Sequence, residues 1–178
     1  MKYVEENALY VGLDDSNHAG DSKGEIIVAT FSFLHEDSLK KLFQNRRNFQ
    51  KTQQWIEKPQ RSYKFTILTA EKYRHSHANL VLIAPLLISS FLEGLETPPP
   101  ILKIYLDGRL NPGGRERLRE IFLRKKAVES VVVDNFIKKR GRHNCPPVIY
   151  HADGLASLLY REKTSEELSQ SKNLVLSK

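Results

Sequence analysis

The chain has 178 residues, a length that fits one domain with a core of ordinary size and leaves little room for two. Its hydrophobic share of 40% and aromatic share of 9% are typical of a globular protein, and 28% of its residues are charged, with a formal net charge of +7. The single cysteine excludes an internal disulfide and indicates a reducing, cytoplasmic setting, and no segment reads as a signal peptide or a membrane span. A basic surface attracts polyanions, most often nucleic acid, although a basic charge also serves solubility alone.

Strand-like and helical segments open the chain. Residues 8–14 and 25–33 are strand-like, and the turn-forming residues between them predict an antiparallel hairpin with a long tip. Residues 35–50 have a helical spacing of apolar positions, and residues 62–69 are strand-like again. We therefore expect an antiparallel meander at the start of a sheet.

Helices and strands then alternate. Residues 70–95 predict a helix with a kink or break before Pro85, and the prolines of ETPPP end it because proline lacks the N–H that a continuing helix needs. Residues 101–107 predict a strand that ends in an acid. A helix over residues 115–126 follows.

The last part of the chain adds a strand over residues 128–136 and, within 148–163, a short extended piece followed by a helix with an apolar stripe. The closing SQSKNLVLSK is expected to be loosely ordered. This order predicts a single α/β domain over residues 1–178. Its mixed five-stranded sheet would begin as an antiparallel meander, continue in parallel βαβ units and be flanked by helices.

Three acids lie at the ends of predicted elements: Asp14 ends the first strand, Asp107 ends the strand after the prolines, and Asp153 opens the last helix. If the strands of Asp14 and Asp107 are parallel neighbours, their ends lie side by side, and a helix starting near that edge adds Asp153. Clustered carboxylates repel one another unless cations bind among them, and hard ions such as Mg²⁺ or Mn²⁺ prefer oxygen ligands. The three acids therefore predict a divalent metal site.

Each of these acids also has a structural explanation. Asp14 and Asp15 suit a turn, Asp107 with Gly108 is a common turn pair, and Asp153 suits a helix N-cap. Because strand side chains alternate, Asp14 and Asp15 face opposite sides of the sheet unless the strand bends. We therefore expect Asp14 to be the direct ligand and Asp15 to have a secondary role.

Taken together, the two strands that end in Asp and the late helix opening HADGLASLLYR resemble the ribonuclease H-like superfamily. The segment GLDDSNHAG is similar to the Asp-Glu-Ser-Gly opening of a large, mostly uncharacterised prokaryotic branch, with Asp15 in place of Glu and Asn17 in place of Gly. The resemblance covers the whole chain in element order. It implies phosphodiester cleavage with two Mg²⁺ or Mn²⁺ ions held by Asp14, Asp107 and Asp153, and Asp15 is a further candidate ligand.

Basic residues supply candidate contacts to a nucleic-acid substrate. Arg109 directly follows Asp107 and could hold a phosphate. A basic loop that could track the backbone, or simply be solvated, contains Lys138, Lys139, Arg140 and Arg142. His151 could add a ligand, relay a proton or cap the last helix, and Lys64 could point toward the site or toward solvent.

Three functions remain open. The first is a metal-dependent nuclease, for which a branched substrate would favour a homodimer. The second is a catalytically inactive ribonuclease H-like domain that binds nucleic acid or another protein. The third is a metal-dependent phosphohydrolase with Asp14 as nucleophile, which ranks last because the acids are adjacent and no Gly-rich phosphate loop follows them.

Overall fold

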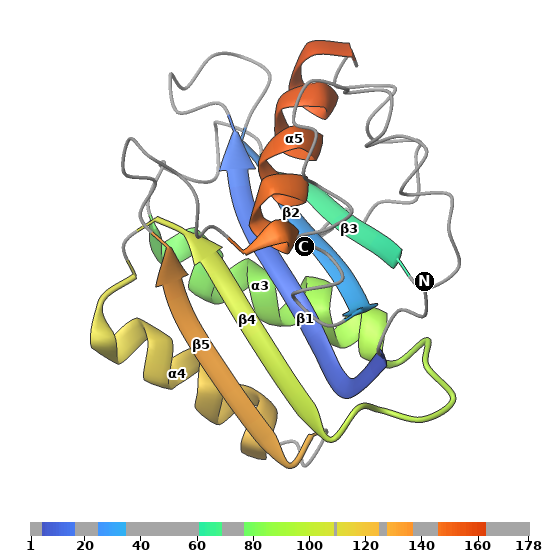
Figure 1. Ribbon diagram of the computed structural model, residues 1–178. Helices are drawn as coiled ribbons and strands as arrows, with labels where there is room; N and C mark the ends of the chain where they lie inside the picture. The colour runs from blue at the N-terminus through green and yellow to red at the C-terminus, as the bar shows by residue number, and fades with distance from the viewer. Residues whose placement is uncertain are drawn as a thin grey trace.

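The described part of the chain is built around one mixed sheet. The computed structural model describes residues 5–16, 25–34, 61–68, 77–108, 110–124, 128–136 and 146–162. The strands are β1 (Glu5–Ser16), β2 (Glu25–Leu34), β3 (Arg61–Leu68), β4 (Ile101–Asp107) and β5 (Ser130–Phe136). They lie in the order β3-β2-β1-β4-β5 (Figure 1). The pairs β1/β2 and β2/β3 are antiparallel and β1/β4 and β4/β5 are parallel, which confirms the expected meander followed by parallel units.

Helices cover both faces of this sheet. The helices are α3 (His77–Leu92), α4 (Pro112–Arg124) and α5 (Pro147–Glu162). Figure 1 shows α5 in front of β1 and β2, with α3 and α4 behind the sheet. Among the described helices, none is both long and apolar enough to cross a membrane. The helix expected over residues 35–50 and the loose order expected for SQSKNLVLSK lie outside the described residues.

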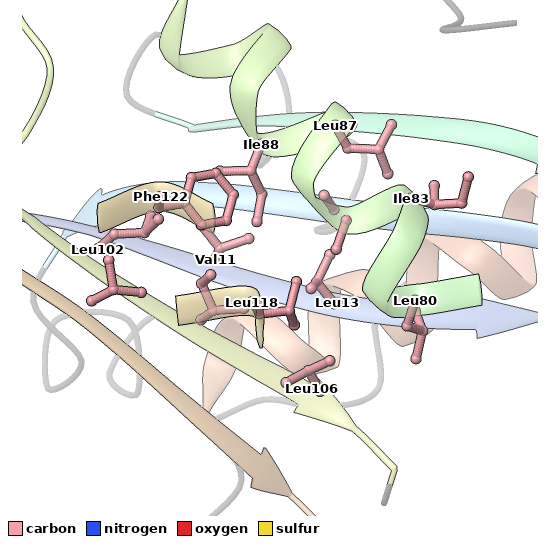
Figure 2. Packing of buried hydrophobic residues seen from close by; sticks show 14 of the residues in the cluster. Val11, Leu13, Leu80, Ile83, Leu87, Ile88, Leu102, Leu106, Leu118 and Phe122 are labelled. Carbon is pink, nitrogen blue, oxygen red and sulfur yellow. The ribbon is translucent and has the colours of Figure 1, made fainter. Parts of the chain in front are cut away.

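The main core lies between the sheet and the pair α3 and α4. Alternate residues of β1 and β4 face this side, since Val11, Leu13 and Leu106 belong to one buried cluster with residues of both helices (Figure 2). The alternate residues of β1 face α5, where Tyr10 packs with Val148, and Leu155 and Leu159 of the same helix pack against β2. Two-residue alternation therefore divides each central strand between two apolar layers, as the strands of a doubly covered sheet require.

Two helices differ from the expectation. The sequence predicted a kink or a break before Pro85, and the break does not occur, because helix α3 continues through the proline. Buried residues on both sides of it, such as Ala84 and Leu87, pack into the core and compensate for its missing N–H. Helix α4 begins at Pro112, three residues before the predicted start at residue 115. Proline suits the first helical position, and Asn111 caps the helix by accepting a hydrogen bond of 2.7 Å from the Gly114 N–H.

Candidate functional site

Asp14 lies near the end of β1, on the side of the sheet that α5 covers. It pairs across the sheet with Val28, which packs in the cluster with α5, and it follows Gly12, which lies directly under the first turn of that helix. The side chain is buried, with 5% of its surface exposed. A carboxylate removed from water to this extent requires polar or cationic partners, so its position is chemically informative.

Asp15 faces the opposite side of the sheet, as the alternation predicted. Its pairing partner Ile27 belongs to the core under α3 and α4, and Asp15 itself is 8% exposed. The Asp15 backbone N–H donates a hydrogen bond of 2.9 Å to the Asp14 Oδ1 atom. Asp15 therefore contributes to the orientation of Asp14 through its backbone, while its own side chain lies on the other face.

Asp107 is the last residue of β4 and lies beside Asp14. The parallel register pairs Leu13 with Leu106, so Asp14 and Asp107 each occupy the next position in their strand. Both leucines face the main core, and alternation therefore directs both acids toward the α5 side. The prediction that β1 and β4 are parallel neighbours with their acids at one edge is confirmed.

The turn after Asp107 is tied to the end of β5. Gly108 adopts a φ of 133°, a backbone conformation that side-chain-bearing residues rarely adopt, and its N–H donates to the Phe136 carbonyl over 3.1 Å. The Asn135 side chain accepts from the Leu110 N–H at 3.3 Å and donates through its amide nitrogen to the Leu110 carbonyl. These bonds hold the chain that leaves the site against the neighbouring strand.

Asp153 reaches the site from within α5 rather than from its start. The helix begins at Pro147, so the prediction that Asp153 opens it was wrong, and what was expected to be an extended piece forms the first turn. Proline's fixed φ and missing N–H favour this earlier start. Asp153 is half-buried and lies one turn after buried Ile149 and three residues before buried Ala156. It therefore occupies the margin of the sheet-facing side of α5, and it is too far along the helix to be an N-cap.

His151 is also inside α5 and is almost completely buried, with 1% of its surface exposed. Its place in the second turn excludes the predicted role of capping the helix start. The apolar stripe predicted for this helix is confirmed by the burial of Ala152, Leu155 and Leu159. His151 thus lies among residues that pack against the sheet.

The acids suit a divalent cation in donor type and in the face and edge that they share. Carboxylate oxygens are the ligands that Mg²⁺ and Mn²⁺ prefer, and two carboxylates at adjacent strand ends repel each other unless a cation lies between them. Within the described ranges, however, no three His, Cys, Asp or Glu side chains are grouped so that they could hold a metal ion. The tight cluster of three carboxylates expected from the sequence is therefore not preformed there, although the backbone positions that would supply it are.

Several predicted substrate contacts lie outside the described residues. These are Arg109 and the whole basic loop. The members of that loop are Lys138, Lys139, Arg140 and Arg142. Lys64 belongs to β3, where it pairs with Ala29, but its side chain is not described. The substrate contacts expected of these residues stay predictions.

Three residues that organise the site escaped the sequence reasoning: Gly12, Thr30 and Asn135. Gly12 and Thr30 each carry a weak local signal. A glycine inside a strand marks close approach of another backbone, and a threonine in an apolar strand needs a buried hydrogen-bond partner. The hydrogen-bond partner of Thr30, the Val148 carbonyl, lies 118 residues further along the chain. A local pattern does not report such a remote partner, so this contact was not predicted.

Comparison with known proteins identifies the architecture. The ribonuclease HII of the PCNA complex from Archaeoglobus fulgidus superposes with a TM-score of 0.52 at 14% sequence identity, over 90% of this chain and 75% of that chain. The ribonuclease H2 from Pyrococcus horikoshii OT3 gives a TM-score of 0.53 at 17% identity, over 92% of this chain and 76% of that chain. No protein-family model and no curated protein matches the sequence. At such identities the likeness shows the fold alone: this is a ribonuclease H-like α/β fold.

Proposed function

We propose that the protein is a nuclease that uses divalent metal ions to cleave phosphodiester bonds. The observation that carries the proposal is the in-register parallel pairing of β1 and β4, which sets Asp14 and Asp107 at adjacent positions on the α5 side of the sheet. A helix acid, Asp153, lies on the margin of the covering helix. The ribonuclease H-like fold supports the same assignment, because the two similar structures are ribonucleases by name.

The positions of the four acids suggest a role for each. Asp14 and Asp107 would hold the ions between the two strand ends, and Asp153 would complete the oxygen donors from the helix. When bound there, Mg²⁺ or Mn²⁺ ions would supply an activated water and stabilise the leaving oxygen. Asp15 would act through its backbone N–H, which fixes the Asp14 carboxylate, since its side chain faces the other side of the sheet.

The proposed substrate is nucleic acid. A strand that contains RNA is the first candidate, because the two similar structures are ribonucleases by name. The net charge of +7 favours a polyanion, and Arg109 and the basic loop of residues 138–142 would contact its phosphates. Such phosphate contacts position a backbone without reading its sequence. Binding should therefore weaken steeply as the salt concentration rises.

A second candidate is a ribonuclease H-like domain that binds nucleic acid without cleaving it. One observation favours it: the described residues contain no preformed group of three metal-ligating side chains. On this account, Asp14 and Asp107 would serve the structure of the sheet edge only.

The deciding experiment is cleavage of labelled single-stranded RNA, single-stranded DNA, RNA–DNA hybrid, duplex and junction substrates in Mg²⁺, Mn²⁺ or EDTA. The variants are Asp14→Asn, Asp107→Asn and Asp153→Asn, each of which removes charge while keeping shape. Glu129→Gln is the matched control, because Glu129 is an exposed acid immediately before β5, at the opposite end of the sheet.

Metal-dependent cleavage that falls at least a hundredfold in the three Asp variants but not in the control supports the nuclease. If the wild type binds one of the substrates in a salt-sensitive manner and cuts none of them, the binding domain replaces it. Cleavage that survives in EDTA, or in Asp14→Asn, rejects the proposed metal site.

A further inference from the structure

Helix α5 is fastened to the sheet at one point by a buried hydroxyl. Thr30 of β2 has none of its surface exposed, and its Oγ1 donates a hydrogen bond of 2.8 Å to the carbonyl oxygen of Val148 in the first turn of α5. The same hydroxyl lies 3.4 Å from the carbonyl oxygen of Gly12, its neighbour across the β1/β2 pair. Thr30 therefore links the helix and the first strand within one buried contact.

Gly12 makes the approach possible. A Cβ atom at this position would lie 2.3 Å from both the carbonyl carbon and the oxygen of Val148, and 2.8 Å from the Ile149 nitrogen. These are backbone atoms of the helix, which cannot turn aside as a flexible side chain does. Because residue 12 has no side chain, the first turn of α5 packs directly against the backbone of β1.

From this contact, β1 and α5 run toward the same edge of the sheet. Later residues of α5, including Leu155 and Leu159, pack on Val28 and Ile26, which pair with Asp14 and Ser16 of β1. Figure 1 shows α5 crossing from β1 toward β2 as it rises. The residues of α5 that follow the contact therefore approach that edge from a starting point set by Gly12 and Thr30.

Both acids follow the contact within a few residues. Asp14 is two residues beyond Gly12, about 6.7 Å along a strand. Asp153 is five residues beyond Val148, about 7.5 Å along a helix. Because both segments are short and regular, the point at which α5 is attached to β1 fixes where Asp153 lies relative to Asp14.

We propose that Thr30 and Gly12 are positioning residues that set the position of Asp153 relative to Asp14 and thereby the affinity of the site for divalent ions. The inference rests on the proposed function, because it assumes that both acids hold the ions. Groups that orient metal ligands commonly change metal affinity by about 10- to 100-fold when they are removed. Neither residue touches the ions or the substrate on this account.

The test measures Mn²⁺ affinity by the paramagnetic resonance signal of free Mn²⁺, which needs no substrate. Thr30→Val keeps the branched shape and removes the hydroxyl, while Thr30→Ser restores it. Thr66→Val is the matched control, because Thr66 is an equally buried threonine that pairs with Ile27 on the face of the sheet away from α5. Circular dichroism confirms the fold of each variant, and Thr30→Cys, which lacks a strong donor, replaces Thr30→Val should the latter not fold.

We expect Thr30→Val to weaken Mn²⁺ binding about tenfold or more, with Thr30→Ser and Thr66→Val within about twofold of the wild type. The Mn²⁺ concentration that gives half-maximal cleavage should rise by the same factor. If Thr30→Val binds like the wild type while Asp14→Asn does not bind, the positioning role is rejected and the metal site stands. If the wild type and Asp14→Asn bind Mn²⁺ equally, the proposed function fails, and the positioning role fails with it.

Discussion

Substitution by alanine should have opposite effects on stability at Gly12, which contacts the first turn of α5, and at Gly154, which has open space around it. In Gly12→Ala, the new Cβ would lie 2.3 Å from the Val148 carbonyl carbon and oxygen. Ordinary van der Waals contact begins at 3.4 Å, so the helix and strand must separate by about 1.1 Å, the difference between the two distances. In Gly154→Ala, by contrast, nothing lies within 4 Å of the added atom.

The energies follow from these surroundings. Overpacking of a well-packed core costs about 1–3 kcal/mol, and Gly12→Ala should reach the upper value, about 3 kcal/mol, because the obstructing atoms are backbone. Gly154→Ala should stabilise the protein by about 0.5–1 kcal/mol, because alanine favours a helix interior and reduces the freedom of the unfolded chain. For a chain of this size, each kcal/mol of change in the free energy of unfolding shifts the melting temperature by about 2–4 °C. Gly12→Ala should then melt roughly 6–12 °C lower than the wild type, and Gly154→Ala roughly 1–4 °C higher.

Thermal and guanidinium denaturation followed by circular dichroism measure both variants under identical conditions. The slope of the free energy of unfolding against denaturant should stay constant, so that the midpoints report stability. A Gly12→Ala protein as stable as the wild type would show that α5 does not seat on β1 as described. Equal losses at both glycines would mean that loss of glycine itself, rather than the close approach, causes the effect.

Three further predictions concern the frame around the site. Asn135→Leu should lower the free energy of unfolding by about 1–3 kcal/mol in guanidinium denaturation, because it leaves the Leu110 N–H and carbonyl without their side-chain partner; an unchanged midpoint would contradict this role. Phe122→Ala should cost about 3–5 kcal/mol in the same assay, since the ring is fully buried in the main core, and a loss below 1 kcal/mol would contradict that packing. Glu120→Gln should change stability by no more than about 0.5 kcal/mol, because its 2.8 Å bond to Arg124 lies on the exposed surface of α4; a larger loss would show that this pair is not screened by solvent.

The sheet and its edge could be predicted from the sequence because they depend on local pattern. Strand-like runs bounded by turn-forming residues predicted the strands. The meeting of the acids at residues 14 and 107 was then predicted by assuming that their two strands are parallel neighbours. The opposite orientations of Asp14 and Asp15 needed only the two-residue period of a strand.

The placement of α5 could not be predicted in this way. Its start depends on Pro147 as a first helical residue, and its height on the sheet depends on the contact of Val148 with Gly12 and Thr30. Both partners are remote in the chain, and a local pattern does not report remote contacts. Likewise, α3 passes through Pro85 because tertiary packing outweighs the local preference for a break.

The central claim, that Asp14 and Asp107 hold divalent ions on the α5 side of the sheet, is tested most directly by a crystal structure of the protein with Mn²⁺. An anomalous difference map would locate each ion independently of the protein coordinates. The expected result is a peak at the ends of β1 and β4, within coordination distance of carboxylate oxygens of both acids, that is lost in Asp14→Asn. Mn²⁺ found only at other residues, or no peak at millimolar Mn²⁺ in crystals of the wild type, would contradict it.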